Sequence, residues 1–111
     1  MIHLWGYRFS VYTWIVRMAL AERGLDYGWS EVNPFDPDCP NPHPFGRVPL
    51  LGHGALRVYE TGAITTYLDQ AFPGESWTPV APLAQARVAQ VIGIVDSYGY
   101  WPMVRQIFAG A

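Results

Sequence analysis

Residues 47–61 read RVPLLGHGALRVYET, and this stretch decides the fold expected for the chain. It holds two short apolar runs, Val48–Leu51 and Leu56–Tyr59, joined by Gly52-His53-Gly54-Ala55. Two such runs with a short connection that contains glycine are typical of a β-hairpin. Pro49 cannot donate to a ladder from its own position, so it suits the entry to a strand. The stretch therefore predicts two antiparallel strands.

A helix is predicted directly after the hairpin, from Thr61 to Phe72, and Pro73-Gly74 ends it. Apolar residues recur on one side at helical spacing, and polar residues occupy the other. The apolar side holds Ile64, Tyr67, Leu68, Ala71 and Phe72, and the polar side holds Thr65, Thr66, Asp69 and Gln70. We expect the apolar side to face the core.

A strand, a helix and a second strand are predicted before the hairpin. Residues 2–7 and 25–32 have the composition of strands, and Val11–Arg23 has that of a helix between them. Ser10 is a favoured N-cap and Gly24 a favoured C-terminal stop for this helix. Elements this close together predict a right-handed βαβ unit with parallel strands.

The helix before the hairpin is expected to be mostly buried. Its apolar side is predicted to hold Val11, Ile15, Met18 and Ala19, while a narrow polar stripe holds Thr13 and Arg17.

Five prolines fall within residues 33–46, so this segment is predicted to be an irregular loop with at most one helical turn. Residues 73–81 resemble a linker. Pro82 suits the first turn of a broadly apolar helix that is predicted to run to Phe108, with a kink at Pro102. The expected order is β-α-β-loop-β-β-α followed by one helix, which is an α/β fold.

Composition excludes several classes of function. The net charge is −2, and the seven basic residues, all arginine, form no patch, so we expect no nucleic-acid partner. No stretch is long and apolar enough to span a membrane, and the N-terminus lacks the features of a signal peptide. The lone Cys39 cannot form an internal disulfide, which suits a reducing compartment, and we expect a cytoplasmic protein. The histidines have no metal-ligand spacing, so no metal is expected.

Ser10 is the first candidate for chemistry, because it lies where a strand passes into the N-terminus of a helix. The helix dipole and the exposed N–H groups favour an anion there. A hydroxyl at this position can donate a hydrogen bond to a thiolate, which lowers the pKa of the thiol. The alternative is that Ser10 is a plain helix cap.

The second candidate is the segment Arg47-Val48-Pro49. An extended Val48 can pair its N–H and C=O with a bound peptide, as in strand addition. A cis bond before Pro49 would turn the Val48 backbone toward a ligand. Arg47 can hold a carboxylate with two hydrogen bonds. The alternative is a turn into a strand, with a solvated arginine.

The third candidate is the pair Glu60-Thr61, which opens the second helix. Thr61 is a good cap, and the N–H groups beside it can bind a carboxylate. Glu60 can accept from an α-amino group. The alternative is an ordinary capped helix start. Taken together, the three candidates match the chemical parts of bound γ-glutamyl-cysteinyl-glycine, which is glutathione.

The chain resembles the glutathione S-transferase family over nearly all of its length. The resemblance rests on Ser10 with Arg17-Met18-Ala19-Leu20 after it, on residues 41–51, and on Glu60-Thr61-Gly62-Ala63-Ile64 with Tyr67-Leu68. It is strongest to bacterial and zeta-like serine types. It implies a thioredoxin-like, glutathione-binding domain over residues 1–76 and the first helix of a truncated all-helical domain over residues 82–111.

The resemblance also implies roles for the candidate residues. Pro49 would be cis and Val48 would pair with the cysteinyl part of glutathione. Glu60 and Thr61 would hold the γ-glutamyl end, and Arg47 would lie near the glycyl carboxylate. Ser10 would be the catalytic residue, and the partners would be glutathione, a small electrophile and a second copy of the chain in a homodimer.

Some features depart from the family pattern. Val11 replaces a proline that often follows the catalytic residue, and Tyr7 is a rival hydroxyl one residue from the position used by tyrosine types. The segment 33–44 is shorter than the usual second helix, and the chain stops soon after Phe108, before the helices that supply most of the pocket for the second substrate.

The expected function is a glutathione transferase that activates the thiol for attack on a small apolar electrophile. Within enzymes, glutathione-dependent isomerisation is the variant. The alternatives are a non-catalytic interaction module with the same fold, or an inactive fragment. A dithiol mechanism is not expected, because Cys39 lies in a proline-rich loop with no second cysteine.

Overall fold

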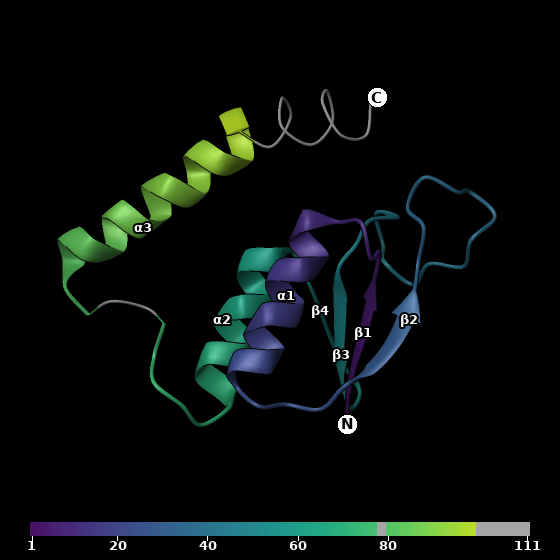
Figure 1. Cartoon of the computed structure of the whole chain (residues 1–111), viewed down its shortest axis with the longest axis horizontal. Helices are drawn as coiled ribbons and strands as arrows, with labels where there is room; N and C mark the ends of the chain where they lie inside the picture. The colour runs from purple at the N-terminus through teal and green to yellow at the C-terminus, as the bar shows by residue number, and fades with distance from the viewer. Residues whose placement is uncertain (78–79, 100–111) are drawn as a thin grey trace. The chain divides into compact units, whose positions relative to one another are not determined.

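The computed structural model describes residues 1–77 and 80–99 of the chain. The chain divides into two compact units, Met1–Glu75 and Ser76–Ala111. The first unit contains a four-stranded sheet and two helices (Figure 1). Its elements are β1 (Ile2–Gly6), α1 (Val11–Glu22), β2 (Gly28–Glu31), β3 (Leu50–His53), β4 (Leu56–Tyr59) and α2 (Thr61–Ala71). The predicted β-α-β-loop-β-β-α order is confirmed.

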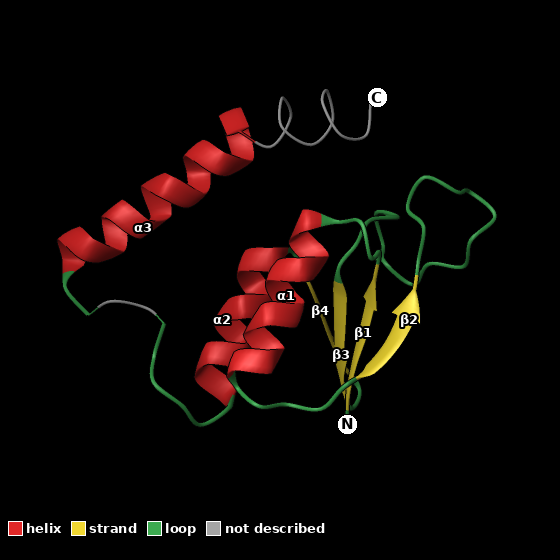
Figure 2. Ribbon diagram, in the orientation of Figure 1, coloured by secondary structure: helices red, strands yellow, loops and turns green. Residues whose placement is uncertain are grey.

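The sheet is mixed, with the strand order β2-β1-β3-β4 (Figure 2). β1 and β2 are parallel, as expected of a βαβ unit, and the pairs β1–β3 and β3–β4 are antiparallel. Both helices lie on the same side of the sheet, so the unit has two layers (Figure 1). This is the thioredoxin-like architecture that the family resemblance implies.

The first strand of the hairpin lies two residues later along the chain than its apolar run suggests, whereas the second strand, Leu56–Tyr59, has the predicted bounds. The first strand begins at Leu50 rather than at Val48, and His53 pairs with Leu56 across a two-residue turn. Gly54 has φ +61°, a value that glycine adopts without steric cost and that the first central position of a type II′ turn requires. The turn therefore uses only Gly54 and Ala55 of the predicted four-residue connection.

The predicted buried face of α1 is wrong except for Ala19, which packs partly buried against the core. Val11, Ile15 and Met18 are exposed, whereas Thr13, Val16 and Leu20 are fully buried. Both sets have helical spacing, and the contacts with the sheet and α2 select the second one. Thr13 is buried instead of forming a polar stripe, because its hydroxyl has a hydrogen-bond role in the β1–α1 connection described below.

The core of the first unit comes from both layers. Its buried apolar residues are Ile2, Leu4, Val16, Leu20, Leu51, Ile64 and Leu68. Ile64 and Leu68 are the two residues of the predicted apolar side of α2 that are fully buried, and Tyr67 and Phe72 pack partly buried against the same core.

Asp69 is the exception on α2, because it was expected on the polar side and is buried. Its carboxylate accepts a hydrogen bond from the Arg23 guanidinium at 2.6 Å, and both side chains are nearly inaccessible to solvent. A buried charge requires a partner of opposite charge or hydrogen-bond donors. The end of α1 at Arg23 supplies that partner, which links the two helices.

The register of the sheet brings the ends of several elements to one edge, which here means the border of the sheet at which β1 and β4 end and β3 begins. Trp5 of β1 pairs with Leu50 of β3, and Leu50 pairs with Tyr59 of β4, so these three residues lie side by side. The chain leaves β1 toward α1, enters β3 and leaves β4 toward α2 at this same edge (Figure 1). Neighbouring strands are about 5 Å apart, so the three connections are neighbours.

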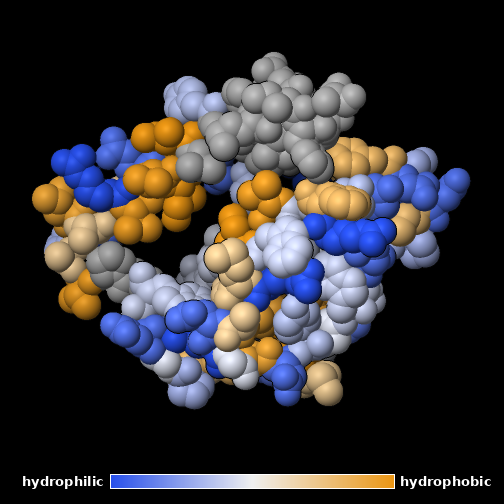
Figure 3. All heavy atoms as spheres, in the orientation of Figure 1, coloured by the Kyte–Doolittle hydropathy of each residue, from blue (hydrophilic) through white to orange (hydrophobic). Residues whose placement is uncertain are grey.

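The second unit contains α3 (Pro82–Ile94), which continues as a short π-helical turn over Val95–Gly99. The predicted continuation to Phe108 and the kink at Pro102 lie outside the described residues. Hydrophobic side chains cover much of the visible face of α3 (Figure 3), and Leu83, Val88, Val91 and Ile92 are exposed. Across residues 1–77 and 80–99, no helix has the length and apolar character needed to cross a bilayer.

Candidate functional site

Ser10 is the N-cap of α1. Its backbone is extended, and its hydroxyl oxygen accepts a hydrogen bond from the Thr13 N–H at 3.2 Å. This geometry is the capping role that the sequence left open as the alternative. A hydroxyl that accepts one hydrogen bond can still donate its own proton, so capping and thiolate binding are compatible at this residue.

Thr13 fixes the connection between β1 and α1, a role that the sequence reasoning missed. Its buried hydroxyl accepts a hydrogen bond from the Tyr7 N–H at 3.2 Å, and the Ser10 N–H donates to the Tyr7 carbonyl at 2.9 Å. Together these bonds hold the turn that presents Ser10. The one available signal was a threonine three residues after a serine cap at the start of an apolar helix.

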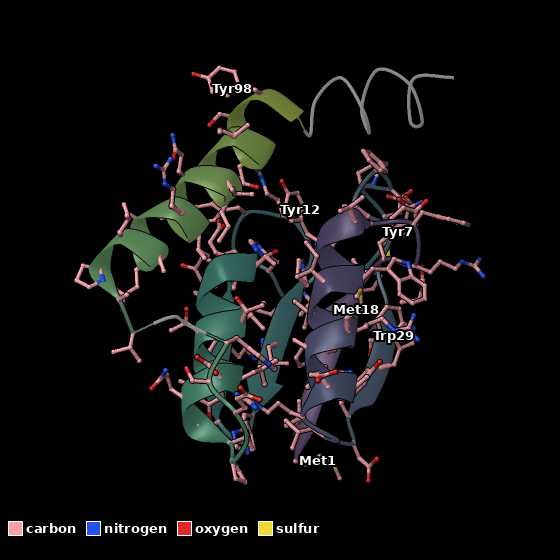
Figure 4. The ribbon with its side chains drawn as sticks, turned by 60° about the vertical axis from the view of Figure 1, so that its left-hand side comes forward. Met1, Tyr7, Tyr12, Met18, Trp29 and Tyr98 are labelled. Atoms are coloured by element: carbon pink, nitrogen blue, oxygen red, sulfur yellow. The ribbon has the colours of Figure 1, made fainter. Side chains whose placement is uncertain are left out.

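Tyr7 lies at the same end of α1 as Ser10. Figure 4 shows Tyr7 and Tyr12 near the start of the helix, with Met1 at the opposite end of the sheet. The Tyr7 ring meets the edges of the Phe9 and Phe35 rings at centroid distances of 5.4 and 6.1 Å. Tyr7 therefore lies near the start of α1, with its ring in a small aromatic cluster.

Val48 precedes Pro49 at the entry to β3, and the peptide bond between them is cis. Pro49 is buried and Val48 is half-buried. Within the described part of the chain, the hydrogen bonds of turns, loops and caps do not use the N–H or the C=O of Val48. This backbone can therefore pair with an extended peptide that lies along the edge of the sheet.

Glu60 rather than Thr61 occupies the N-cap position of α2, which corrects the sequence prediction that Thr61 is the cap. Thr61 is the first residue of the helix, and the Glu60 side chain makes no capping hydrogen bond. The first N–H groups of α2 therefore have no acceptor in the side chain of the N-cap residue. N–H groups at the N-terminus of a helix favour a carboxylate.

The backbone of Glu60 is unusual. Its φ is +74°, and it is the one non-glycine residue with positive φ among the described residues. Strained backbone of this kind costs about 1–3 kcal/mol and is concentrated at binding and catalytic sites. The positive φ of Glu60 sets the direction in which its exposed side chain leaves the junction between β4 and α2.

Arg47 supplies positive charge beside this edge. Its side chain is exposed, and its carbonyl accepts a hydrogen bond from the Asn41 side-chain amide at 3.1 Å. His43, in the same loop, is buried and lies close enough to both Glu60 and Arg47 for their charges to affect its pKa. In the sequence, His43 is one of three isolated histidines.

The structure brings the predicted site residues to one edge of the sheet, through three connections. Ser10 follows β1, Val48 and Arg47 precede β3, and Glu60 and Thr61 follow β4. Among residues 1–77 and 80–99, there is no group of three or more histidine, cysteine or carboxylate side chains that could hold a metal ion. The site combines backbone donors, one hydroxyl, one carboxylate and one guanidinium, which suits a zwitterionic peptide with a thiol.

A two-layer unit with the strand order β2-β1-β3-β4 defines the class of thioredoxin-like domains, and comparison with known proteins identifies the family within it. Residues 4–76 match the family described as "Glutathione S-transferase, N-terminal domain". The chain belongs to the glutathione S-transferase family.

Similar proteins agree with this assignment. A glutathione S-transferase from Pseudomonas putida is 33% identical over 103 residues, with 88% of this chain and 45% of the relative covered. Glutathione S-transferase 1 from Dianthus caryophyllus is 32% identical over 101 residues, with 86% of this chain and 46% of the relative covered. The chain therefore spans about half the length of these relatives.

A solved structure has the same fold. The crystal structure of a glutathione transferase homologue from Burkholderia, with bound glutathione, superposes with a TM-score of 0.75 at 25% identity. The superposition covers 86% of this chain and 54% of the Burkholderia chain.

Proposed function

We propose that this chain binds glutathione along the edge of the sheet and that Ser10 stabilises the glutathione thiolate for attack on a small apolar electrophile. The observation that carries the proposal is the register of Trp5, Leu50 and Tyr59, because it makes neighbours of the connections that hold Ser10, Val48 and Glu60. Family membership and the glutathione in the Burkholderia homologue support it.

Each part of glutathione has a proposed partner at this edge. The cysteinyl unit pairs with the N–H and C=O of Val48, next to Pro49. The α-amino group of the γ-glutamyl unit donates to Glu60, and its carboxylate accepts from the N–H groups at Thr61. The glycyl carboxylate binds Arg47.

In the proposed reaction, the Ser10 hydroxyl donates a hydrogen bond to the thiolate sulfur, and the N-terminus of α1 adds a favourable positive potential. Both effects stabilise the charged form, so the thiolate fraction rises roughly tenfold for each unit by which the thiol pKa falls. The sulfur then forms a bond to an electrophilic carbon, whose leaving group departs with the electron pair.

The remaining features of the whole protein are also proposals. Residues 1–76 would form the glutathione-binding domain, and residues 82–111 the first helix of an all-helical domain that shapes the electrophile pocket. We further propose a cytoplasmic homodimer. Because the chain spans half of its relatives, we expect weak glutathione binding and poor transferase activity from it alone.

The binding proposal is tested by calorimetric titration of the purified chain with glutathione and with γ-glutamylcysteine, which lacks the glycyl unit. The wild-type chain is expected to bind glutathione about 10-fold more tightly than γ-glutamylcysteine. The reason is that a charge-assisted bond between Arg47 and the glycyl carboxylate contributes about 1.5–3 kcal/mol when it is well formed. Arg47→Gln should remove this preference while binding to γ-glutamylcysteine stays constant. A folded chain that binds neither peptide would instead favour an interaction module.

The role of Ser10 is tested by substitutions that separate capping from thiolate binding. Ser10→Ala is expected to destabilise the chain by about 1 kcal/mol through the lost cap, whereas Ser10→Gly costs only a few tenths. Both should raise the pKa of the bound thiol, measured by the pH dependence of thiolate absorbance, and Ser10→Thr should restore it. Tyr7→Phe is the matched control, and a raised thiol pKa in that variant alone would assign the activation to Tyr7.

A further inference from the structure

His43 is a buried side chain within a loop whose other residues are mostly exposed. Only 6% of its surface is accessible, while Pro42, Pro44, Phe45 and Arg47 are exposed. Its ring packs against the Tyr59 ring at a centroid distance of 5.0 Å. Tyr59 is the last residue of β4, directly before Glu60, so His43 connects the loop before β3 to the end of β4.

Two further ring contacts complete this packing. The Phe45 ring lies 6.0 Å from the His43 ring and 5.9 Å from the Tyr59 ring, in the latter case edge to face. Aromatic pairs at these separations contribute about 0.5–1.5 kcal/mol beyond their buried area. The loop therefore contacts β4 through both His43 and Phe45.

The imidazole also closes a turn by a hydrogen bond. His43 Nδ1 accepts from the Phe45 N–H at 3.0 Å, which requires Nδ1 to carry no proton. Asn41 makes the equivalent bond two residues earlier, where its side-chain oxygen accepts from the His43 N–H at 3.0 Å. His43 thus takes the place that an asparagine or aspartate side chain usually has in such turns.

The bonds around His43 shape the approach to Val48. The Gly46 N–H donates to the His43 carbonyl at 3.1 Å, and the Asn41 amide donates to the Arg47 carbonyl at 3.1 Å. These bonds close residues 41–47 into a loop, and the turn from His43 to Phe45 lies at its centre. Opening that turn would displace Arg47 and the adjacent Val48 together.

The surroundings of His43 favour its neutral form. Burial lowers the pKa of His43 below its ordinary value of 6.5, the Glu60 carboxylate acts in the opposite direction, and Arg47 adds to the lowering. The Tyr59 hydroxyl is the other titratable group of an element packed against the ring. Because the folded state disfavours protonation of His43, the loop has its full stability at a pH above the pKa of histidine in the unfolded chain. It loses stability as the pH falls through the lowered pKa of His43 in the folded chain.

We propose that His43 is a positioning residue for glutathione: its neutral imidazole holds the turn that presents Arg47 and Val48, and protonation of Nδ1 opens that turn. A protonated Nδ1 would place a second donor against the Phe45 N–H, and the hydrogen bond would be lost. The inference rests on the proposed glutathione site, because it concerns the residues that would bind the glycyl and cysteinyl units.

The test compares glutathione affinity from about pH 7.5 down to about pH 5, the interval in which histidine changes charge. In the wild-type chain, the dissociation constant should rise by up to tenfold per pH unit once the pH is below the pKa of His43. His43→Phe keeps a ring but lacks the acceptor, so it should bind about 2- to 10-fold more weakly at neutral pH. His43→Asn should recover most of that affinity and remove the acid-dependent loss, because its side-chain oxygen can accept from the Phe45 N–H without titrating.

His53→Asn is the matched control. His53 also uses Nδ1 in a hydrogen bond, to the Tyr67 hydroxyl at 2.6 Å, but it pairs with Ile2 at the opposite edge of the sheet. This variant should keep the wild-type pH dependence. Equal pH dependence in the wild-type chain and in His43→Asn would overturn the proposal.

A measurement without glutathione separates this inference from the proposed function. The amide resonance of Phe45 in a nitrogen-15 NMR titration should shift with the protonation of His43. A shift combined with no glutathione binding would reject the binding site and retain the turn, whereas a Phe45 amide that is indifferent to the titration would reject the role of His43 itself.

Discussion

Replacing Asp69 with alanine is expected to lower the free energy of unfolding by about 3–5 kcal/mol, the largest stability effect of any substitution considered for this chain. The Asp69 carboxylate accepts from the Arg23 guanidinium at 2.6 Å, and the two side chains are only 2% and 3% exposed. Removal of the carboxylate takes this acceptor away from a buried guanidinium, and less of the cost of desolvating that charge is then compensated.

Urea denaturation of the purified chain measures this loss directly. The control is the double variant Arg23→Met with Asp69→Leu, which removes both charges and keeps apolar volume. Replacing a buried ion pair in this way is often neutral or stabilising. We therefore expect the double variant to be at least about 2 kcal/mol more stable than Asp69→Ala. Equal stability of the two variants would show that the lost interaction is packing rather than charge.

Replacing Glu60 with glycine is expected to change stability and glutathione binding in opposite directions. Glu60 has φ +74°, which glycine tolerates and other residues adopt at a cost. Glu60→Gly should raise the free energy of unfolding by about 1 kcal/mol, after allowance for the greater freedom of glycine in the unfolded chain. It should also weaken glutathione binding about 10- to 100-fold, because a hydrogen bond between charged groups is lost.

Glu60→Ala is the matched control for this prediction. Alanine has a Cβ atom, so the backbone strain remains, but the carboxylate is absent. Its binding should therefore fall as in Glu60→Gly, while its unfolding free energy stays near the wild-type value. Calorimetric titration and urea denaturation of the two variants give both quantities. If Glu60→Gly binds glutathione as well as the wild-type chain does, Glu60 has no part in binding.

Local signals in the sequence were sufficient for the elements of the first unit. The hairpin follows from two short apolar runs and the glycine at position 54, and α1 follows from a serine before and a glycine after a helical pattern. Connection lengths then restrict the topology, since a strand, a helix and a strand in close succession form parallel neighbours. These features depend on a few adjacent residues.

The residues at which the strands begin and end were predicted less accurately from the sequence. β2 is shorter than the predicted 25–32, and β3 begins at Leu50, after the cis Val48–Pro49 bond. Ladder pairing with β1 decides where each of these strands starts and stops. That pairing joins residues far apart in the sequence, and local composition does not report it.

The candidate site was only partly visible in the sequence. Ser10, Val48 and Glu60 could be selected one by one, and the structure now places their connections at a single edge. The contributions of Thr13 and His43 were not predicted, because each depends on a hydrogen bond and on burial by elements that are distant in the chain.

The sequence by itself determined the order of elements, the βαβ unit, the hairpin and the family, because backbone propensity and turn chemistry act between neighbouring residues. The tertiary structure alone decided which face of α1 is buried, why Asp69 can be charged inside the protein, and which residues meet at the edge of the sheet. The physical reason is that burial and ion pairing depend on contacts between distant segments. The identity of an apolar or charged residue is the same whether or not another element covers it, so the sequence alone does not report its burial.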